Sequence, residues 1–320
     1  MALKYRFIAN PTARGGRGRR QWPEIRSMLE ARQVSYEWRE SEHAGHSVEL
    51  AREAAGKGVE VVVAVGGDGT INEVLGGVMS APERAQGRGC ALGIVYTGTS
   101  PDVCRFHRIP FSPTRAAVEV LLRDRRSKVD VGRVEYFESN DSSAGFASDR
   151  PPVIGYFLCA VNLGVGAAVA TGSNSGLRKV LGDGLGTFAS IVAAVAAYRH
   201  ADFDCRVDGA ALRTARTLNL TIGKNPFIAS GLKVLVPVEH DDGRLYLFAV
   251  NGFGMLGLLA NLHRFYRGSF QEDPRNTLTY LSEFECAYNE VAHMVEFDGD
   301  HRGYLPCRIK VLQRALDLVK

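Results

Sequence analysis

One stretch, Val61 to Leu75, constrains the fold of this chain more than any other. Its first five residues, Val61–Val65, are all apolar, as in a parallel strand that is covered on both faces. Three glycines then follow within four positions and end the strand. Apolar residues recur after them at helical spacing, at Ile71, Val74 and Leu75. The stretch therefore predicts a strand, a glycine turn and a helix N-terminus in direct succession.

Such a turn is a natural anion site, because free backbone N–H groups and the positive end of the helix face one point. Asp68 lies within the turn, where its carboxylate would repel a phosphate unless a cation lay between them. We therefore interpret Asp68 as positioning Mg²⁺ or its water shell, with Glu73 as a further partner. The alternative is a tight turn in which Asp68 only caps the helix. The stretch is neither a Walker loop nor a Gly-x-Gly-x-x-Gly motif.

The turn Gly66-Gly67-Asp68-Gly69-Thr70, followed by Asn72-Glu73, resembles the signature of the diacylglycerol kinase catalytic-domain family. That family includes sphingosine, ceramide and bacterial lipid kinases. NAD kinases and phosphofructokinases share the Gly-Gly-Asp-Gly core, so the turn alone does not choose among these enzymes. The resemblance implies that Gly66, Gly67, Asp68, Gly69, Thr70 and Glu73 serve ATP and Mg²⁺ binding.

A second strand–loop–helix unit opens the chain. Tyr5–Ala9 reads as a strand, residues 10–18 as a glycine-rich loop and Arg20–Arg32 as a helix, an order that suits a polyphosphate. The loop resembles the family's Asn-Pro-x-x-Gly phosphate loop, and by that resemblance Asn10, Pro11, Thr12 and Arg14 contact the nucleotide. The family also places the residue at Ser41 near the nucleotide. His43 and His46 have metal-like spacing but no third ligand, so we expect surface or capping roles.

A third loop follows the predicted strand Cys90–Tyr96. The family usually has Gly-Thr-Gly-Asn-Asp-Phe-Ala-Arg here, and Gly98, Thr99, Asp102 and Arg105 match it. By this resemblance Thr99 contacts the nucleotide, and Asp102 lies on the substrate side and helps orient Mg²⁺. Ser100-Pro101 replaces the usual Gly-Asn, and proline fixes φ and removes an N–H from the loop.

The order of elements predicts two domains. Strands and helices alternate as far as a helix near Thr114–Arg123 and a strand near Val129–Tyr136, which predicts an α/β domain with a mostly parallel sheet over residues 1–137. This domain resembles those of NAD kinases and phosphofructokinases. Its three glycine loops all follow strands, so we expect them at the carboxyl edge of the sheet.

Residues 138–320 predict a β-rich sandwich that binds the lipid substrate. A polar, turn-rich segment, residues 138–152, opens it, and an apolar helix is expected at Gly186–Tyr198. Asp208-Gly209 is a hairpin signal. The predicted strands are Ile154–Val161, Phe203–Val207, Leu212–Ile222, Leu232–Val236, Leu245–Val250, Leu278–Glu285, Glu290–Phe297 and Arg308–Leu312.

Two acidic turns in this half carry possible chemistry. In Glu239-His240-Asp241-Asp242-Gly243-Arg244 the aspartates before glycine suit a plain turn. In bacterial members of the family a similar turn holds a structural Mg²⁺ through the Asp carboxylate and nearby carbonyls. The resemblance therefore assigns this metal to Asp242, with Glu239 and Arg244 beside it.

The second acidic turn is Phe297-Asp298-Gly299-Asp300, which also reads as a hairpin turn. The family has Asp-Gly-Glu here and assigns the acidic residue in third place as the base that takes the lipid hydroxyl's proton. That position is Asp300, one methylene shorter than Glu, so the base is Asp300 or Asp298. This motif separates lipid kinases from NAD kinases and phosphofructokinases.

Composition limits partners and location. Residues 1–40 hold nine Lys and Arg against four Glu, and such a cluster can meet nucleotide phosphates or anionic headgroups. No aromatic residues interleave the arginines, so nucleic acid is the least favoured partner. The six cysteines form no Cys-x-x-Cys pair, and we interpret them as reduced and packed. No apolar run reaches the length of a membrane span, so we expect a cytoplasmic protein, peripheral at the membrane.

The sequence thus predicts an ATP-dependent lipid kinase with ATP and Mg²⁺, acting on a diacylglycerol-type lipid at the membrane surface. A ceramide or sphingoid-base kinase of the same family is the first alternative. An NAD kinase and a catalytically dead ATP- or lipid-binding regulator are more remote ones, the latter suggested by Ser100-Pro101 and Asp300. Gly252–Leu262 is interpreted as a core helix or, less favoured, a membrane-facing one. The oligomeric state stays open, with a homodimer as one candidate.

Overall fold

The computed structural model describes residues 4–85, 87, 89–140, 146, 150–172, 198–228, 232–254, 257, 260, 261, 264, 267 and 269–320. The predicted helix Gly186–Tyr198 lies outside these residues except for Tyr198. Much of the apolar stretch Gly252–Leu262 and of the polar segment 138–152 also lies outside them.

The N-terminal part of the chain builds a layered α/β unit. Strands β1 (Tyr5–Ala9), β2 (Tyr36–Glu40), β3 (Val61–Gly66) and β4 (Ala91–Tyr96) pair in parallel in the order β4-β3-β1-β2. The β-branched residues of β3 are buried on both faces of the sheet, as their unbroken apolar run predicts. The helical elements are η1 (Ala13–Gly15), α1 (Arg17–Ala31), α2 (His46–Gly56), α3 (Asp68–Met79), α4 (Pro82–Ala85), α5 (Asp102–His107) and α6 (Thr114–Arg123).

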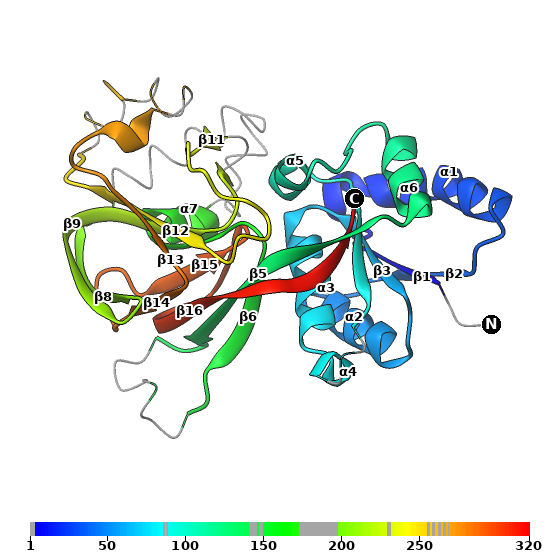
Figure 1. Ribbon diagram of the computed structural model, residues 1–320, viewed down its shortest axis with the longest axis horizontal. Helices are drawn as coiled ribbons and strands as arrows, with labels where there is room; N and C mark the ends of the chain where they lie inside the picture. Colours follow the sequence, from blue (N-terminus) through cyan, green and yellow to red (C-terminus); the bar gives the residue numbers. More distant parts are fainter. Residues whose placement is uncertain are drawn as a thin grey trace.

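Helices cover both faces of this sheet (Figure 1). On one face α2 and α3 pack into a core with alternate residues of the strands, such as Ile8, Val62 and Ala64. On the other face α1 and α6 pack against Phe7 and Val63. Because each strand contributes residues to both cores, the positions of the loops at its ends are fixed from both sides.

The C-terminal part is built mainly of antiparallel strands. Its residues form a second core between the strands. The strands are β5 (Arg126–Phe137), β6 (Val153–Phe157), β7 (Ala160–Gly164), β8 (Ala201–Val207), β9 (Ala210–Gly223), β10 (Phe227–Ile228), β11 (Leu232–Lys233), β12 (Leu245–Asn251), β13 (Thr277–Leu281), β14 (Glu283–Cys286), β15 (Met294–Phe297) and β16 (Asp300–Val319), with helix α7 (Val165–Gly172) and turn η2 (Phe270–Glu272). The predicted Asp208-Gly209 hairpin is confirmed, since both residues have positive φ between β8 and β9.

A two-stranded ribbon of β5 and β16 joins the two parts (Figure 1). β16 begins at the β15–β16 hairpin and ends beside β4, where Leu318 pairs with Leu92. The C-terminus therefore lies in the N-terminal lobe, and all the strands except β10 and β11 belong to one continuous sheet. The order of an α/β part before a β-rich part is as predicted, while the boundary at residue 137 stays a prediction.

Several predicted strands differ from the observed ones. Two are shorter than predicted, since Leu232–Val236 is strand only in β11 (Leu232–Lys233) and Glu290–Phe297 only in β15 (Met294–Phe297). Ile154–Val161 is two strands, β6 and β7, because the amides of Leu158 and Cys159 turn aside to bind Asp298. Leu278–Glu285 is also two strands, β13 and β14, because Ser282 between them donates to Asp208. Arg308–Leu312 is only the middle of β16, whose register shifts on both sides of this segment and so hides the strand's period of two.

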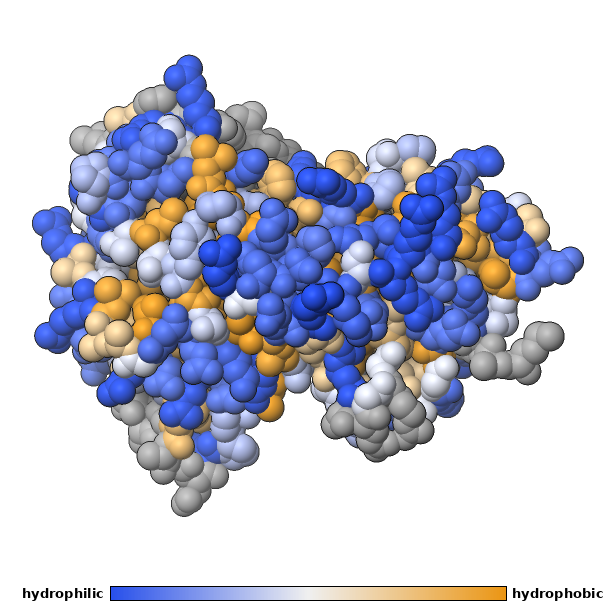
Figure 2. Space-filling model, in the orientation of Figure 1, coloured by the Kyte–Doolittle hydropathy of each residue, from blue (hydrophilic) through white to orange (hydrophobic). Residues whose placement is uncertain are grey.

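The surface carries no large apolar band on the face in Figure 2, where apolar residues lie in small groups among hydrophilic ones. The large hydrophobic side chains that are most exposed, such as Ile154 and Leu235, are well separated in sequence. No helix among the described residues is long and apolar enough to span a bilayer. All six cysteines are free, and Cys159 is the only one not fully buried.

His107, at the end of α5, makes the fold sensitive to acid. It is buried, neither ring nitrogen has a hydrogen-bond partner among the described residues, and burial together with nearby cationic groups lowers its pKa to about 3. An unfolded chain, with a histidine pKa of about 6.5, takes up a proton that the folded chain refuses. Stability should therefore fall as the pH drops from about 6.5 toward 3, by up to about 1.4 kcal/mol per pH unit from this residue.

The substitution His107→Leu should remove this contribution, because leucine is apolar and of similar size. Urea denaturation at pH 7 and pH 5 would measure it, with the difference in unfolding free energy smaller in the variant than in the wild type. An equal difference in both proteins would show that His107 is charged, or solvated, in the folded state.

Candidate active site

The predicted loops meet at the carboxyl edge of the parallel strands. Asn10 follows β1, Ser41 follows β2, Gly67 to Thr70 follow Gly66 at the end of β3, and Thr97 to Thr99 follow β4. Backbone hydrogen bonds tie them to neighbouring strands, since Asn10 N–H donates to Val65 O and Thr97 N–H to Gly66 O. The sheet therefore brings together residues that are far apart in sequence, as the pattern predicts.

Glycine is required where two of these loops touch. A Cβ built on Gly98 would lie 2.6 Å from the Cα of Gly67, so the two backbones are in direct contact. A Cβ on Gly66 would lie 2.2 Å from Thr70 Oγ1. A side chain at position 98 would push the third loop away from the N-terminus of α3, and a side chain at position 66 would collide with Thr70 within its own turn.

The first loop forms a shallow depression in the surface. Asn10 Oδ1 accepts hydrogen bonds from the N–H and the hydroxyl of Thr12, which fixes the start of the loop. Ser41 is buried, and its N–H donates to Ala9 O. The side chain of Arg14 lies outside the described residues. The depression is lined by Pro11, Thr12, Gly15, Gly16, Arg19 and Arg20.

Asp68, the first residue of α3, lies in an unusual electrostatic environment. Burial, with the charges of Asp102 and Asp298 nearby, raises its pKa to about 8. The hydroxyl of Tyr96 donates to its Oδ2 at 3.2 Å. Its Oδ1 is buried and has no hydrogen-bond donor among the described residues. A buried carboxylate oxygen without a partner, close to two other acidic groups, is suited to a divalent cation.

Glu73 lies one turn further along α3 and points elsewhere. Its Oε1 accepts a hydrogen bond from the N–H of Gly45, just before α2. The contact links the start of α2 to the middle of α3. As a partner of the metal Glu73 stays a prediction, and its observed contact is structural.

Asp298 is the most heavily bonded carboxylate of the site. It accepts hydrogen bonds from Asn72 Nδ2 and Leu158 N–H, both at 3.0 Å, and from Cys159 N–H at 2.9 Å. Burial raises its pKa, and these three donors act against that rise. They come from α3 and from the link between β6 and β7, so Asp298 fixes the β15–β16 hairpin against the N-terminal lobe.

Asp300 has the opposite surroundings. Its side chain is half exposed and makes an ion pair with Arg302 at 3.0 Å. It also lies against the start of α3, because a Cβ built on Gly69 would be 2.9 Å from Asp300 Oδ2. Arg302 in turn donates to Asn72 Oδ1, which places it in contact with the residue that holds Asp298.

Ser100, which departs from the family pattern, helps to hold Asp102 at the start of α5. Ser100 Oγ donates to Asp102 Oδ2 at 2.9 Å, and Arg105 donates to Oδ1 at 2.8 Å. Pro101 stands just before the first helical residue, where its missing N–H costs no helical hydrogen bond. Thr99 is exposed at the edge of the same loop.

Behind the hairpin lies a further buried acid, Glu296. Burial raises its pKa to about 8, although its carboxyl group accepts hydrogen bonds from Asn162 and from the N–H of Gly299. The bond to Gly299 braces the turn that carries Asp298 and Asp300.

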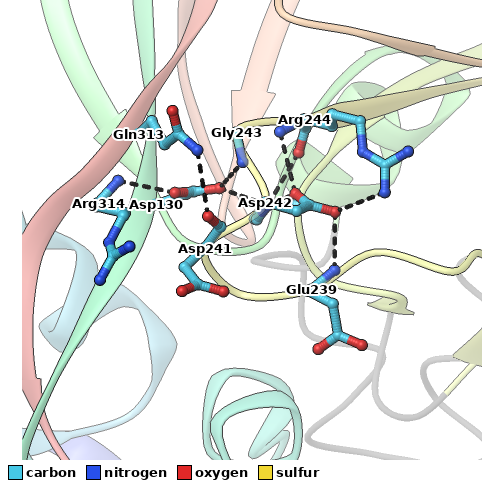
Figure 3. A network of polar contacts seen from close by, with 9 residues as sticks. Asp130, Glu239, Asp241, Asp242, Gly243, Arg244, Gln313 and Arg314 are labelled. Carbon is cyan, nitrogen blue, oxygen red and sulfur yellow. Dashed lines mark hydrogen bonds and ion pairs between the residues drawn. The ribbon is translucent and has the colours of Figure 1, made fainter.

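The turn at residues 239–244 contains the predicted structural metal site (Figure 3). Asp242 accepts hydrogen bonds from the N–H groups of Glu239 and Arg244, and the Arg244 guanidinium lies 3.2 Å away. The ammonium group of Lys224 also contacts Asp242. Burial alone would raise the pKa of Asp242, but the hydrogen bond from Lys224 and those from the backbone hold it below its usual value.

This arrangement does not fit the predicted Mg²⁺ at Asp242. The Lys224 Nζ atom bonds to the Asp242 carboxylate and, at 3.0 Å, to the carbonyl oxygen of Arg244. The ammonium group of Lys224 therefore already contacts the oxygen atoms that a metal ion would need as ligands. Among the described residues no group of three or more His, Cys, Asp or Glu side chains is placed to share a metal ion.

Sequence reasoning did not single out several residues that organise the site. Asn72 was named only as part of the signature, although it lies four residues after Asp68 and so on the same face of α3. Nothing in the local pattern marks Lys224, Asp130 or Arg302, because each has a partner that lies far away in the sequence.

Comparisons with known proteins agree with the predicted family. Residues 4–134 match the diacylglycerol kinase catalytic domain, and residues 159–320 match the YegS C-terminal NAD kinase beta sandwich-like domain. The chain belongs to this lipid kinase family. The predicted kinase class and the order of the two domains are thereby confirmed.

Individual relatives are distant. A diacylglycerol kinase of Staphylococcus haemolyticus (strain JCSC1435) is 33% identical over 129 residues, which are 40% of this chain and 37% of that protein. A diacylglycerol kinase of Staphylococcus aureus (strain bovine RF122 / ET3-1) is 24% identical over 99% of this chain and 92% of its own length. The crystal structure of a diacylglycerol kinase from Bacillus anthracis str. Sterne superimposes with a TM-score of 0.74 at 19% identity, covering 99% of this chain and 96% of that one.

The contact between Gly69 and Asp300 gives a test of the site. The change Gly69→Ala should displace only the flexible end of the Asp300 side chain, while alanine favours the helix. We expect phosphoryl transfer to fall about 10- to 100-fold, since small misplacements of reacting groups have effects of that size. The melting temperature should stay the same or rise.

The matched control is Gly76→Ala in the same helix, where a Cβ meets nothing within 4 Å. It should keep full activity. Equal activities of the two variants would show that the position of Asp300 against α3 does not matter for transfer.

Proposed function

We propose that this protein transfers the γ-phosphate of ATP to a hydroxyl group of a diacylglycerol-type lipid, with Asp300 as the general base. The observation that carries the proposal is the placement of Asp300. It is the half-exposed carboxylate that lies against the N-terminus of α3, where a phosphate group would bind.

The two acids of the hairpin have different surroundings, and these support different roles. All three hydrogen bonds of Asp298 come from groups that position the hairpin, and its carboxylate is buried. Asp300 is open to a substrate, and a base must reach the proton that it abstracts. Asp300 makes an ion pair with Arg302 at 3.0 Å, which orients its carboxylate. We therefore assign the base to Asp300 rather than to Asp298.

The nucleotide would lie along the loops at the carboxyl edge. Backbone N–H groups of residues 66–70 and the dipole of α3 face the transferring phosphate, and the depression at Pro11 to Arg20 offers arginines to the remaining phosphates. Asn10, Ser41 and Thr99 border the same edge. Phosphoryl transfer depends mostly on such positioning and on neutralisation of charge.

Asp68 and Asp102 are the residues that would hold a catalytic Mg²⁺. The unpartnered Oδ1 of Asp68 fits it, and Mg²⁺ in kinases commonly takes only one or two protein carboxylates besides phosphate and water. When bound, the ion supplies neutralisation of the phosphate charge. Asp102 stays fixed by Ser100 and Arg105, so its carboxylate keeps one orientation as substrates bind.

A lipid acceptor requires access to a membrane surface. The chain contains no spanning helix among its described residues, so we propose a peripheral association in the cytoplasm. The basic cluster near Arg17, Arg19 and Arg20 suits anionic headgroups as well as nucleotide phosphates. A homodimer is part of this proposal.

The acceptor can be tested with labelled ATP and Mg²⁺ against detergent-dispersed lipids. The panel contains diacylglycerol, monoacylglycerol, phosphatidylglycerol, ceramide and sphingosine, with NAD assayed beside them. We expect label in phosphorylated diacylglycerol. Label in ceramide or sphingosine would move the protein to the sphingoid-lipid kinases, and label only in NADP would contradict the lipid assignment.

The base assignment predicts unequal effects for the two hairpin acids. Asp300→Asn should lower kcat by about 10²- to 10⁴-fold, because a general base contributes rate accelerations of that size. Its melting temperature and ATP affinity should change little, since the side chain is half exposed. Asp298→Asn should instead lower the melting temperature, because its amide cannot accept all three hydrogen bonds as well as a carboxylate.

The wild-type protein and Asp300→Asn together separate the candidate functions. ATP binding with no transfer in the wild-type protein as well as in Asp300→Asn would indicate a regulator that binds without turnover. Undiminished turnover in Asp300→Asn would refute the assignment of the base.

A further inference from the structure

A second charged cluster lies away from the proposed phosphate site, where the β5–β16 ribbon meets the 239–244 turn. At its centre is Lys224, which directly follows β9 and has only 1% of its side chain exposed. A buried ammonium group is unfavourable unless each of its N–H groups has an acceptor. The structure supplies three acceptors.

Those acceptors come from two segments of the chain, β5 and the 239–244 turn. Lys224 Nζ lies 2.7 Å from Asp130 Oδ2 on β5, it contacts Asp242 Oδ1, and it lies 3.0 Å from the carbonyl oxygen of Arg244. An ammonium group has three N–H donors and no acceptor. Its hydrogen-bonding capacity is therefore matched by carboxylate and carbonyl oxygens, which are also the donors that Mg²⁺ and Ca²⁺ prefer.

The charges of the cluster balance without a metal. Asp130 and Asp242 supply two negative charges, Lys224 supplies one positive charge, and the Arg244 guanidinium contacts the outer oxygen of Asp242. Asp130 is completed by the N–H groups of Gly243 and Arg314, at 2.7 and 2.8 Å (Figure 3). A divalent ion at the same oxygens would meet the ammonium group at contact distance.

We propose that in this chain the ammonium group of Lys224 replaces the structural divalent cation of the Asp242 turn, so that the metal requirement of the protein is confined to the nucleotide site. Lys224 then has the structural task of such an ion. It fastens the 239–244 turn to β5 and to the end of β9.

The cluster also connects with the proposed active site through the next residue. Asn225 Nδ2 donates to the carbonyl oxygen of Asp102 at 2.9 Å, and the N–H groups of Lys224 and Asn225 both donate to Cys159 O. Cys159 N–H is one of the donors to Asp298. Lys224 is therefore a positioning residue. It is connected to Asp102 through Asn225 and to Asp298 through Cys159.

The test is metal-dependent stability without nucleotide. The wild-type protein should have the same melting temperature in EDTA and in millimolar Mg²⁺ or Ca²⁺. In Lys224→Ala the buried Asp130 and the partly buried Asp242 lose their ammonium partner, and the melting temperature in EDTA should fall by roughly 5–15 °C. Mg²⁺ or Ca²⁺ should restore much of it with saturable dependence, because the vacated space now holds only oxygen donors.

The controls identify the ion's position. Adding Asp242→Asn to Lys224→Ala should abolish the rescue. The matched control is Lys128→Ala. Lys128 lies two residues before Asp130, is exposed and pairs with Asp317, so its removal should have little effect on the melting temperature, with or without metal.

Three results would overturn the proposal. The first is a rise in the wild-type melting temperature with Mg²⁺ that Asp242→Asn removes. The second is Lys224→Ala with wild-type stability in EDTA, and the third is a loss of stability that neither ion restores.

If Lys224→Ala does not fold, Mn²⁺ binding to folded wild-type protein decides the question by electron paramagnetic resonance. The number of bound ions should be the same in wild type and Asp242→Asn. A site lost in Asp242→Asn would contradict the proposal.

Discussion

The buried carboxylate of Asp298 is the interaction on which the proposed active site depends. It receives three hydrogen bonds, from α3 and from the amides between β6 and β7, and charge-assisted bonds of this kind contribute about 1.5–3 kcal/mol each. Through them the β15–β16 hairpin is fixed against α3, the helix that follows the glycine turn at residues 66–70. Asp300, two residues later, thereby reaches the N-terminus of α3 while staying half exposed.

Placing several acidic groups close together in this site costs free energy, which cations bound with the substrate can offset. Asp68 is held among other carboxylates, and its pKa rises to about 8 because burial and their charges disfavour ionisation. Such clusters of perturbed acids are typical of functional sites, where cations that bind with the substrate can neutralise their charges. The Asp242 turn shows the contrasting solution, in which the protein's own ammonium group satisfies the buried acids. In our proposals, one acidic cluster binds a metal ion together with the substrate, and in the other Lys224 takes the place of the ion.

Much of this could be predicted from local patterns. The unbroken apolar run of β3, the glycines after it and the helical spacing after Asp68 specify a loop at the carboxyl edge, and the loop lies there. The Asp298-Gly299 pair specifies a hairpin with positive φ. What could not be predicted depends on contacts between distant segments. No local pattern shows that Lys224 reaches Asp130, that Asn72 holds Asp298, or that β16 runs on to β4 across two shifts of register. The metal ion expected at Asp242 is implied only by the resemblance. In the structure Lys224, eighteen residues earlier, already contacts that carboxylate.

The most direct test of this account is a crystal structure with a non-hydrolysable ATP analogue and Mn²⁺, with anomalous scattering used to locate the metal. The account predicts Mn²⁺ beside the carboxylate of Asp68 and in contact with the phosphates, the γ-phosphate at the start of α3 facing Asp300, and no anomalous peak at Asp242. A nucleotide bound away from the α3 turn, or a metal ion seated on Asp242 with Lys224 displaced, would contradict it.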